Sequence, residues 1–132
     1  LHVVEAHDGL ALEPGLAVLA PGGRHLRIER EEGRLIARVS ALPLRPYTPS
    51  VDELFESGAR SAGARALGVV LTGMGDDGLA GARAIHARGG SLITEAASSC
   101  IVYGMPRCVF EAGLGASPVP LDRVAKEIAE RA

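Results

Sequence analysis

The sequence predicts an α/β domain built in three layers, in which helices flank a mainly parallel sheet and a β-hairpin lies near the N-terminus. Three observations support this fold class. In the second half of the chain, short apolar runs of β-forming residues alternate with segments of helical periodicity. In the first forty residues, apolar and polar side chains alternate with the two-residue period of strands. A proline-rich stretch at residues 43–49 predicts a loop between the halves.

The first forty residues predict strands that end in a hairpin. Residues 1–5 and the apolar run 16–20 have strand character, and Leu26 and Ile28 alternate with polar neighbours. A second alternating run at residues 34–39 follows a polar turn, so the two runs predict a β-hairpin. We expect this hairpin at an edge or on a flank of the main sheet.

Helix boundaries are marked by capping residues. Ser50 and Glu53 have the spacing of a capping box, and the apolar residues that follow recur at helical intervals as far as Gly63, which predicts the end of the helix. Asp122 predicts the cap of a final helix. The inner face of that helix would carry Val124, Ala125, Ile128 and Ala129.

Between these helices the pattern alternates. Residues 67–71 predict a strand, residues 79–88 a helix ended by two glycines, and residues 91–94 another strand. Pro106 predicts the start of a short helix that Gly113 ends. Alternation of strands and helices with short connections predicts a parallel sheet.

Composition limits the classes of partner. The 132 residues suffice for one compact domain, and the net charge of −2 without a run of Lys or Arg indicates neither nucleic acid nor an anionic membrane as a partner. No apolar stretch reaches the roughly 20 residues of a membrane span. Cys100 and Cys108 lack a ligand pattern, so we expect free thiols in a reducing cytoplasm and no metal or cofactor. Because the first residue is Leu1, we expect the chain to begin inside a larger protein.

A glycine-rich turn at residues 73–78 leaves the carboxyl end of a predicted strand, where ligands and catalytic groups collect in parallel sheets. Its three glycines have the spacing of a dinucleotide-binding motif, and Glu95 follows at the end of the next strand. That motif aims bare amides at a pyrophosphate, whereas Asp76 and Asp77 would repel one. The physical chemistry therefore argues against dinucleotide binding.

Two other interpretations of the turn start from its aspartates. Asp76 or Asp77 could cap the helix predicted from Leu79, because a carboxylate is favoured at a helix N-terminus by about 0.5–2 kcal/mol. Three glycines exceed the needs of a cap, and they would allow the close backbone approach typical of an active-site wall. No histidine or third acid has a spacing that supports a metal site.

Two segments make the sequence recognisable when they are taken together. Residues 71–78, LTGMGDDG, and residues 98–107, SSCIVYGMPR, resemble the C-terminal part of the catalytic domain of the protein-glutamate methylesterases of bacterial chemotaxis. The likeness extends back through residues 49–52 and 20–25. On this resemblance, residues 1–132 are the C-terminal portion of a single α/β hydrolytic domain, which removes methyl groups from glutamates of chemoreceptors and in many members deamidates receptor glutamines.

The resemblance also implies roles for residues of the turn. Asp77 would be the acid of a Ser-His-Asp triad, which holds the histidine in the correct tautomer. Met74 would border the site, and amides between Gly73 and Gly75 would help to bind the oxyanion. The family's serine and histidine lie upstream of every matched residue, so we expect this chain alone to be inactive. The expected partners are the methylated cytoplasmic region of a chemoreceptor and an N-terminal receiver domain in the complete protein.

No replacement for the serine or the histidine emerges from this sequence. It contains no GxSxG elbow, and its serines predict structural roles: Ser50 as a cap, Ser57 and Ser61 on helix faces, Ser98 and Ser99 in a turn. None of the four histidines is placed as a base. A second hypothesis is therefore a non-catalytic binding module of a signalling protein, and a dinucleotide-binding domain is the third.

Overall fold

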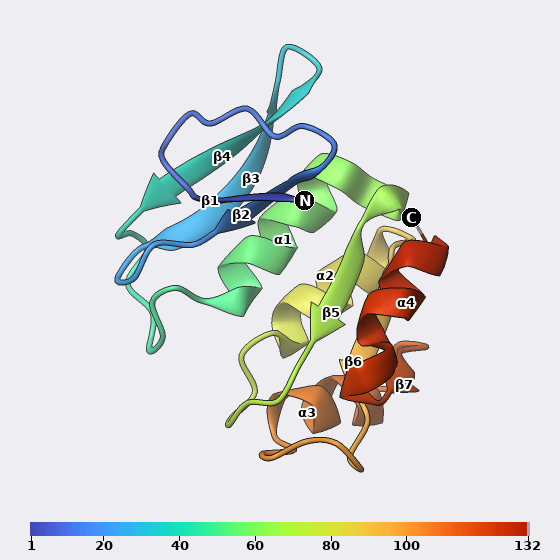
Figure 1. The fold of residues 1–132 in the computed structure, drawn as a ribbon. Coiled ribbons are helices and arrows are strands. Elements are labelled where there is room, and N and C mark those ends of the chain that lie inside the picture. The colour runs from blue at the N-terminus through green and yellow to red at the C-terminus, as the bar shows by residue number, and fades with distance from the viewer. Residues whose placement is uncertain (132) are drawn as a thin grey trace.

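The computed structural model describes residues 1–131 and has the predicted architecture, a parallel sheet flanked by helices together with a two-stranded hairpin (Figure 1). Helix α1 (Val51–Ala62) separates the N-terminal strands from the sheet in the second half. Among these residues, no helix is long and apolar enough to cross a bilayer.

The N-terminal strands form two small sheets. Strands β1 (His2–Glu5) and β2 (Leu16–Leu19) pair in parallel, whereas β3 (His25–Glu31) and β4 (Arg34–Ser40) form the predicted antiparallel hairpin. The hairpin does not extend the main sheet, because β3 packs against α1. The core of this N-terminal half contains Ala6, Leu26 and Ala37.

The main sheet consists of three parallel strands in the order β5 (Leu67–Val70), β6 (Ser91–Glu95) and β7 (Ser117–Val119). Successive side chains of β6 point to opposite faces. Leu92 therefore packs with α2 (Leu79–Ala87) and α3 (Met105–Glu111), and Ile93 packs with α4 (Leu121–Arg131) on the other face. These layers place the carboxyl ends of β5 and β6 beside the start of α2.

Helix α1 joins the two halves through close contacts. On one side, Ser57 Oγ accepts a hydrogen bond from the Ile28 amide at 2.9 Å. On the other side, a Cβ added at Gly81 would lie 2.4 Å from Phe55 Cβ, so the absence of a side chain lets α2 approach α1. Gly63 ends α1 with a φ of 56° and begins the short 3-10 helix η1 (Gly63–Arg65).

Several local predictions were wrong. Ser50 precedes α1, but its side chain makes no capping bond to that helix, and Glu53 pairs with Arg45 instead of closing a capping box. On α4, Val124 alone of the four predicted inner residues is buried. Strand β7 was not predicted, because a three-residue segment that contains Pro118 has no strand periodicity.

Candidate active site

The glycine turn lies against the loop that carries the second motif. Gly73 forms a parallel bridge with Tyr103, and its carbonyl accepts hydrogen bonds from the amides of Gly104 and Met105 at 3.0 and 2.8 Å. A Cβ added at Gly104 would lie 2.6 Å from that carbonyl oxygen. The two motifs, far apart in the sequence, therefore form one backbone unit that only glycine permits at this spacing.

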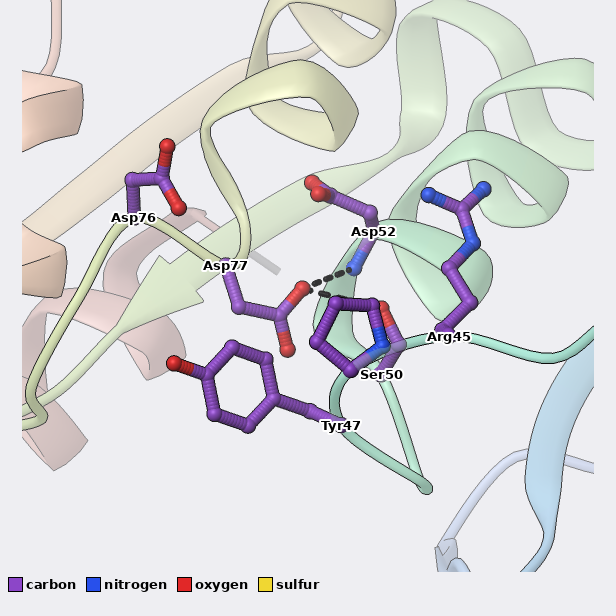
Figure 2. A pocket seen from close by; sticks show the side chains of 7 residues that line it. Arg45, Tyr47, Ser50, Asp52, Asp76 and Asp77 are labelled. Carbon is purple, nitrogen blue, oxygen red and sulfur yellow. Dashed lines mark hydrogen bonds between the residues drawn. The ribbon is translucent and has the colours of Figure 1, made fainter.

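The carboxylate of Asp77 points toward the N-terminus of α1 (Figure 2). Its Oδ1 accepts hydrogen bonds from Ser50 Oγ at 2.9 Å and from the Asp52 amide at 3.0 Å, and its Oδ2 accepts one from the Val51 amide at 2.8 Å. Asp76 points away from this cluster. The acid predicted to be catalytic is thus held by both oxygens, and it is half-buried.

This arrangement changes the capping interpretation. Asp77 caps α1, which is distant in sequence, and not α2, which follows it directly. Helix α2 is capped by Asp52, whose Oδ1 accepts hydrogen bonds from the amides of Gly78 at 3.0 Å and Gly81 at 2.8 Å. The two helices therefore receive each other's acidic side chains at their N-termini, where free amides and the helix dipole favour negative charge.

A buried histidine supports the same cluster. His25 is fully buried, its Nε2 donates to the Pro43 carbonyl at 2.9 Å, and its Nδ1 accepts from the Ser50 amide at 3.0 Å. Donation from Nε2 and acceptance at Nδ1 require the neutral tautomer with its proton on Nε2. No pattern in the sequence singles out His25, because its partners come from a distant loop that carries no periodic signal.

The second motif is anchored by Glu95, which is 1% exposed. Its Oε1 accepts a hydrogen bond from the Thr72 amide and its Oε2 accepts one from Ser99 Oγ, both at 2.9 Å. Ser99 Oγ in turn accepts a bond from the Leu121 amide at 3.0 Å, so its predicted role as a turn residue is confirmed. Because both carboxylate oxygens of Glu95 are engaged in the loops, the acid that a dinucleotide motif would aim at a ribose is occupied here.

A small open cavity of about 210 Å³ adjoins Asp77. The cavity is lined by Arg45, Pro46, Tyr47, Ser50, Asp52, Asp76 and Asp77. Arg45 is fixed by Glu53, with Nε and Oε1 2.8 Å apart, and this hydrogen bond raises the pKa of the guanidinium. Tyr47 is 52% exposed, and its hydroxyl lies near Gly75. The lining of the cavity therefore combines a guanidinium group, an aromatic ring and the carboxylates of three aspartates.

The other predicted residues of the turn differ in whether their backbone amides are already hydrogen-bonded. The Gly73 amide donates to the Val102 carbonyl at 3.1 Å, so it is already used. Among the residues that the structure describes, the amides of Met74, Gly75, Asp76 and Asp77 have no acceptor. Met74 is 79% exposed next to the cavity-lining Asp76 and Asp77. The turn thus retains amides, those of Met74 and Gly75 among them, that could receive a developing negative charge.

No serine and histidine among residues 1–131 form a nucleophile and base beside Asp77. Ser50 Oγ donates directly to the carboxylate without an imidazole between them, and both nitrogens of His25 bind backbone groups. The exposed His86 lies on α2. Ser57 and Ser61 bond to the backbone of Ile28, which confirms their structural roles.

Comparison with known proteins gives consistent matches. A family model described as CheB methylesterase matches residues 1–128. A protein-glutamate methylesterase/protein-glutamine glutaminase of Myxococcus xanthus is 58% identical over 123 residues, which cover 92% of this chain and 35% of the relative. A protein with the same description from Oleidesulfovibrio alaskensis is 47% identical over 127 residues, which cover 96% of this chain and 34% of the relative.

A solved structure agrees with these relatives. The crystal structure of the Thermotoga maritima CheB methylesterase catalytic domain matches with a TM-score of 0.93 and 31% identity. The match covers 97% of this chain and 68% of that one. The chain therefore spans about a third of the length of the curated relatives and about two-thirds of this catalytic domain.

Proposed function

The chain belongs to the CheB methylesterase family, and we propose that it supplies Asp77 as the acid of a Ser-His-Asp triad that hydrolyses glutamate γ-methyl esters and deamidates glutamines on chemoreceptors. The relatives are named as methylesterases and glutaminases, which are enzymes that hydrolyse an ester and an amide of the same side chain. The observation that carries the proposal is the fixed carboxylate of Asp77 at the edge of an open cavity.

The hydrogen bonds of Asp77 suit the role of an orienting acid. An ionised carboxylate offers about four lone-pair sites, and three are used by Ser50 and by the amides at the start of α1. One site on Oδ2 remains for the Nδ1–H of an imidazole. A carboxylate held in one orientation fixes the tautomer of the histidine and stabilises its imidazolium.

In the proposed reaction, a serine Oγ attacks the γ-carbonyl carbon of the ester while the histidine takes the serine proton. The tetrahedral intermediate collapses, the histidine protonates the departing methoxide, and methanol leaves an acyl-enzyme. Water, deprotonated by the same histidine, releases glutamate and restores the serine. With glutamine the leaving group is ammonia, and the other steps are the same.

We assign the serine and the histidine to a part of the longer protein outside these 132 residues. The relatives, about three times as long, leave room for that segment and for a receiver domain. The amides of Met74 and Gly75 are our candidates for binding the oxyanion, with Met74 at the site wall. The partner would be the methylated cytoplasmic region of a chemoreceptor, which places the reaction in the cytoplasm and requires neither nucleic acid nor a membrane.

Substitution of Asp77 tests the proposal. In the complete protein, Asp77→Asn should lower kcat on methylated receptor peptides by about 10⁴, the scale known for loss of the acid in a serine protease triad. Asp122→Asn is the matched control, because Asp122 is an exposed aspartate in the first turn of α4 and does not line the cavity. The control should stay within about threefold of the parent, and an Asp77→Asn rate near the parent rate would remove Asp77 from the triad.

The alternative function is a non-catalytic module that binds a signalling partner. It is favoured by one observation, the lack of a serine-histidine pair beside Asp77 among residues 1–131. Release of methanol by the complete protein would dispose of it. Release of methanol by the isolated 132 residues would contradict the assignment of serine and histidine to another segment.

A further inference from the structure

Asp52 is linked to the glycine turn by both its backbone and its side chain. Its amide donates to Asp77 Oδ1 at 3.0 Å, and its Oδ1 accepts from the amides of Gly78 and Gly81 at 3.0 and 2.8 Å. Asp52 therefore binds the carboxylate of Asp77 and also the residue that follows Asp77 in the chain. No other residue that the structure describes makes both kinds of contact.

The turn depends on this side chain, because it has no cap of its own. Gly78 occupies the N-cap position of α2 with a φ of 102°, a conformation that side chains rarely adopt, and it carries no oxygen to accept the free amides. The Asp52 carboxylate takes that place from another helix. Without it, the backbone around Gly78 would lose two of the hydrogen bonds that hold it to α1, and only those of the Asp77 carboxylate would remain.

We propose that Asp52 is a positioning residue for the reaction, holding the glycine turn so that the Asp77 carboxylate faces the imidazole. This proposal rests on the proposed function of Asp77. The hydrogen bonds of the Asp52 side chain all go to backbone amides at the start of α2, so it would act on the rate through the orientation of Asp77. A displacement of about 1 Å in such a group costs up to about 100-fold in rate.

The test uses the complete protein and begins with three single variants. Asp52→Ala should lower kcat about 10- to 100-fold while KM stays within about threefold, because substrate binding is not the function of this contact. Asp52→Asn keeps an oxygen that can accept the Gly78 and Gly81 amides, and it should restore most of kcat. Asp122→Ala is the matched control, since Asp122 also lies in the first turn of a helix but is exposed, and it should leave kcat unchanged.

A double-mutant cycle separates positioning from general support of the fold. If Asp52 acts through Asp77, adding Asp52→Ala to Asp77→Ala should lower the residual single-turnover rate by less than about threefold. An equal loss in both backgrounds would overturn the proposal, as would a parent-like kcat for Asp52→Ala. A near-parent rate for Asp77→Ala itself would instead overturn the proposed function, so the two failures are distinguishable.

Asp52→Glu keeps the proposal testable if the alanine variant does not fold. Glutamate preserves the charge but moves the acceptor by one methylene, so the turn should shift and kcat should fall about tenfold. Hydrogen exchange of the Gly78 and Gly81 amides would report that shift directly. Unchanged kcat together with faster exchange of these amides would show that their position does not govern the rate, which would overturn the proposal.

Discussion

Replacing His25 with alanine removes the most deeply buried polar support of the site. The imidazole is fully buried and bonds the Pro43 carbonyl through Nε2 at 2.9 Å and the Ser50 amide through Nδ1 at 3.0 Å. Alanine can make neither bond. The variant therefore leaves one acceptor and one donor without their partner in the loop that leads into α1.

The expected loss follows from these two groups. A buried polar group that loses its partner costs about 1–3 kcal/mol, which applies in full to the amide of the buried Ser50 but less to the carbonyl of the exposed Pro43, so the two together cost about 1–4 kcal/mol before any cavity is counted. Urea unfolding of domains of this size has a slope of about 2 kcal/mol per molar. A loss at the upper end of this range should therefore lower the unfolding midpoint by about 2 M urea.

The assay is urea unfolding of the protein that carries this chain, followed by circular dichroism and by hydrogen exchange of the α1 amides. His86→Ala is the matched control, because His86 is exposed on α2 and its removal should change the unfolding free energy by about 0.5 kcal/mol or less. A His25→Ala midpoint within about 0.3 M of the parent would refute the assignment of His25 as a buried support.

Two further predictions concern the second motif. Gly104→Ala would place a methyl group 2.6 Å from the Gly73 carbonyl oxygen. It should therefore cost about 1–3 kcal/mol of stability and lower kcat in the complete protein. Gly22→Ala is the control, because no atom lies within 4 Å of the added carbon, and it should leave kcat unchanged. Equal activities of the two variants would contradict the close approach. Burial, and to a smaller extent the carboxylate of Glu95, raises the pKa of the Cys100 thiol above its usual 9.0. At pH 8, Cys100 should therefore be alkylated more slowly than an ordinary exposed thiol, and its alkylation rate should rise only at higher pH. Peptide mass spectrometry against a short model thiol measures this, and faster alkylation of Cys100 would contradict it.

Local signals in the sequence located most helices and strands. The end of α1 at Gly63 was predicted because glycine alone tolerates the positive φ that stops the helix there. The burial of the inner face of α4 was not predicted correctly. Helical periodicity predicts four buried apolar residues, whereas the sheet beneath buries Val124 and leaves Ile128 39% exposed. Periodicity specifies which residues can pack, and the neighbouring element decides how many do.

The site shows the same limit at the level of single contacts. The sequence pointed to Asp77 because two carboxylates oppose phosphate binding and because the motif resembles a family in which this acid is catalytic. It suggested that the acid caps the following helix, which is wrong, because α1 and α2 approach closely enough to exchange caps. Which helix receives a carboxylate depends on that packing, and the absence of a side chain at Gly81 makes the packing possible.

The capping bonds of Asp77 and its proposed catalytic role can be separated by their magnitudes. Asp77→Asn replaces one oxygen by an amide nitrogen that must face an N–H or O–H donor, which costs about 1–3 kcal/mol. Even from a stability of only about 5 kcal/mol, a loss of 3 leaves about 97% of the protein folded, so unfolding can reduce the rate by only a few per cent. A loss of kcat by about 10⁴ exceeds that by orders of magnitude and can come only from the orientation or charge of the reacting groups. Measured together, the melting curve would therefore report the cap and kcat would report the triad, even though the same two oxygens serve both.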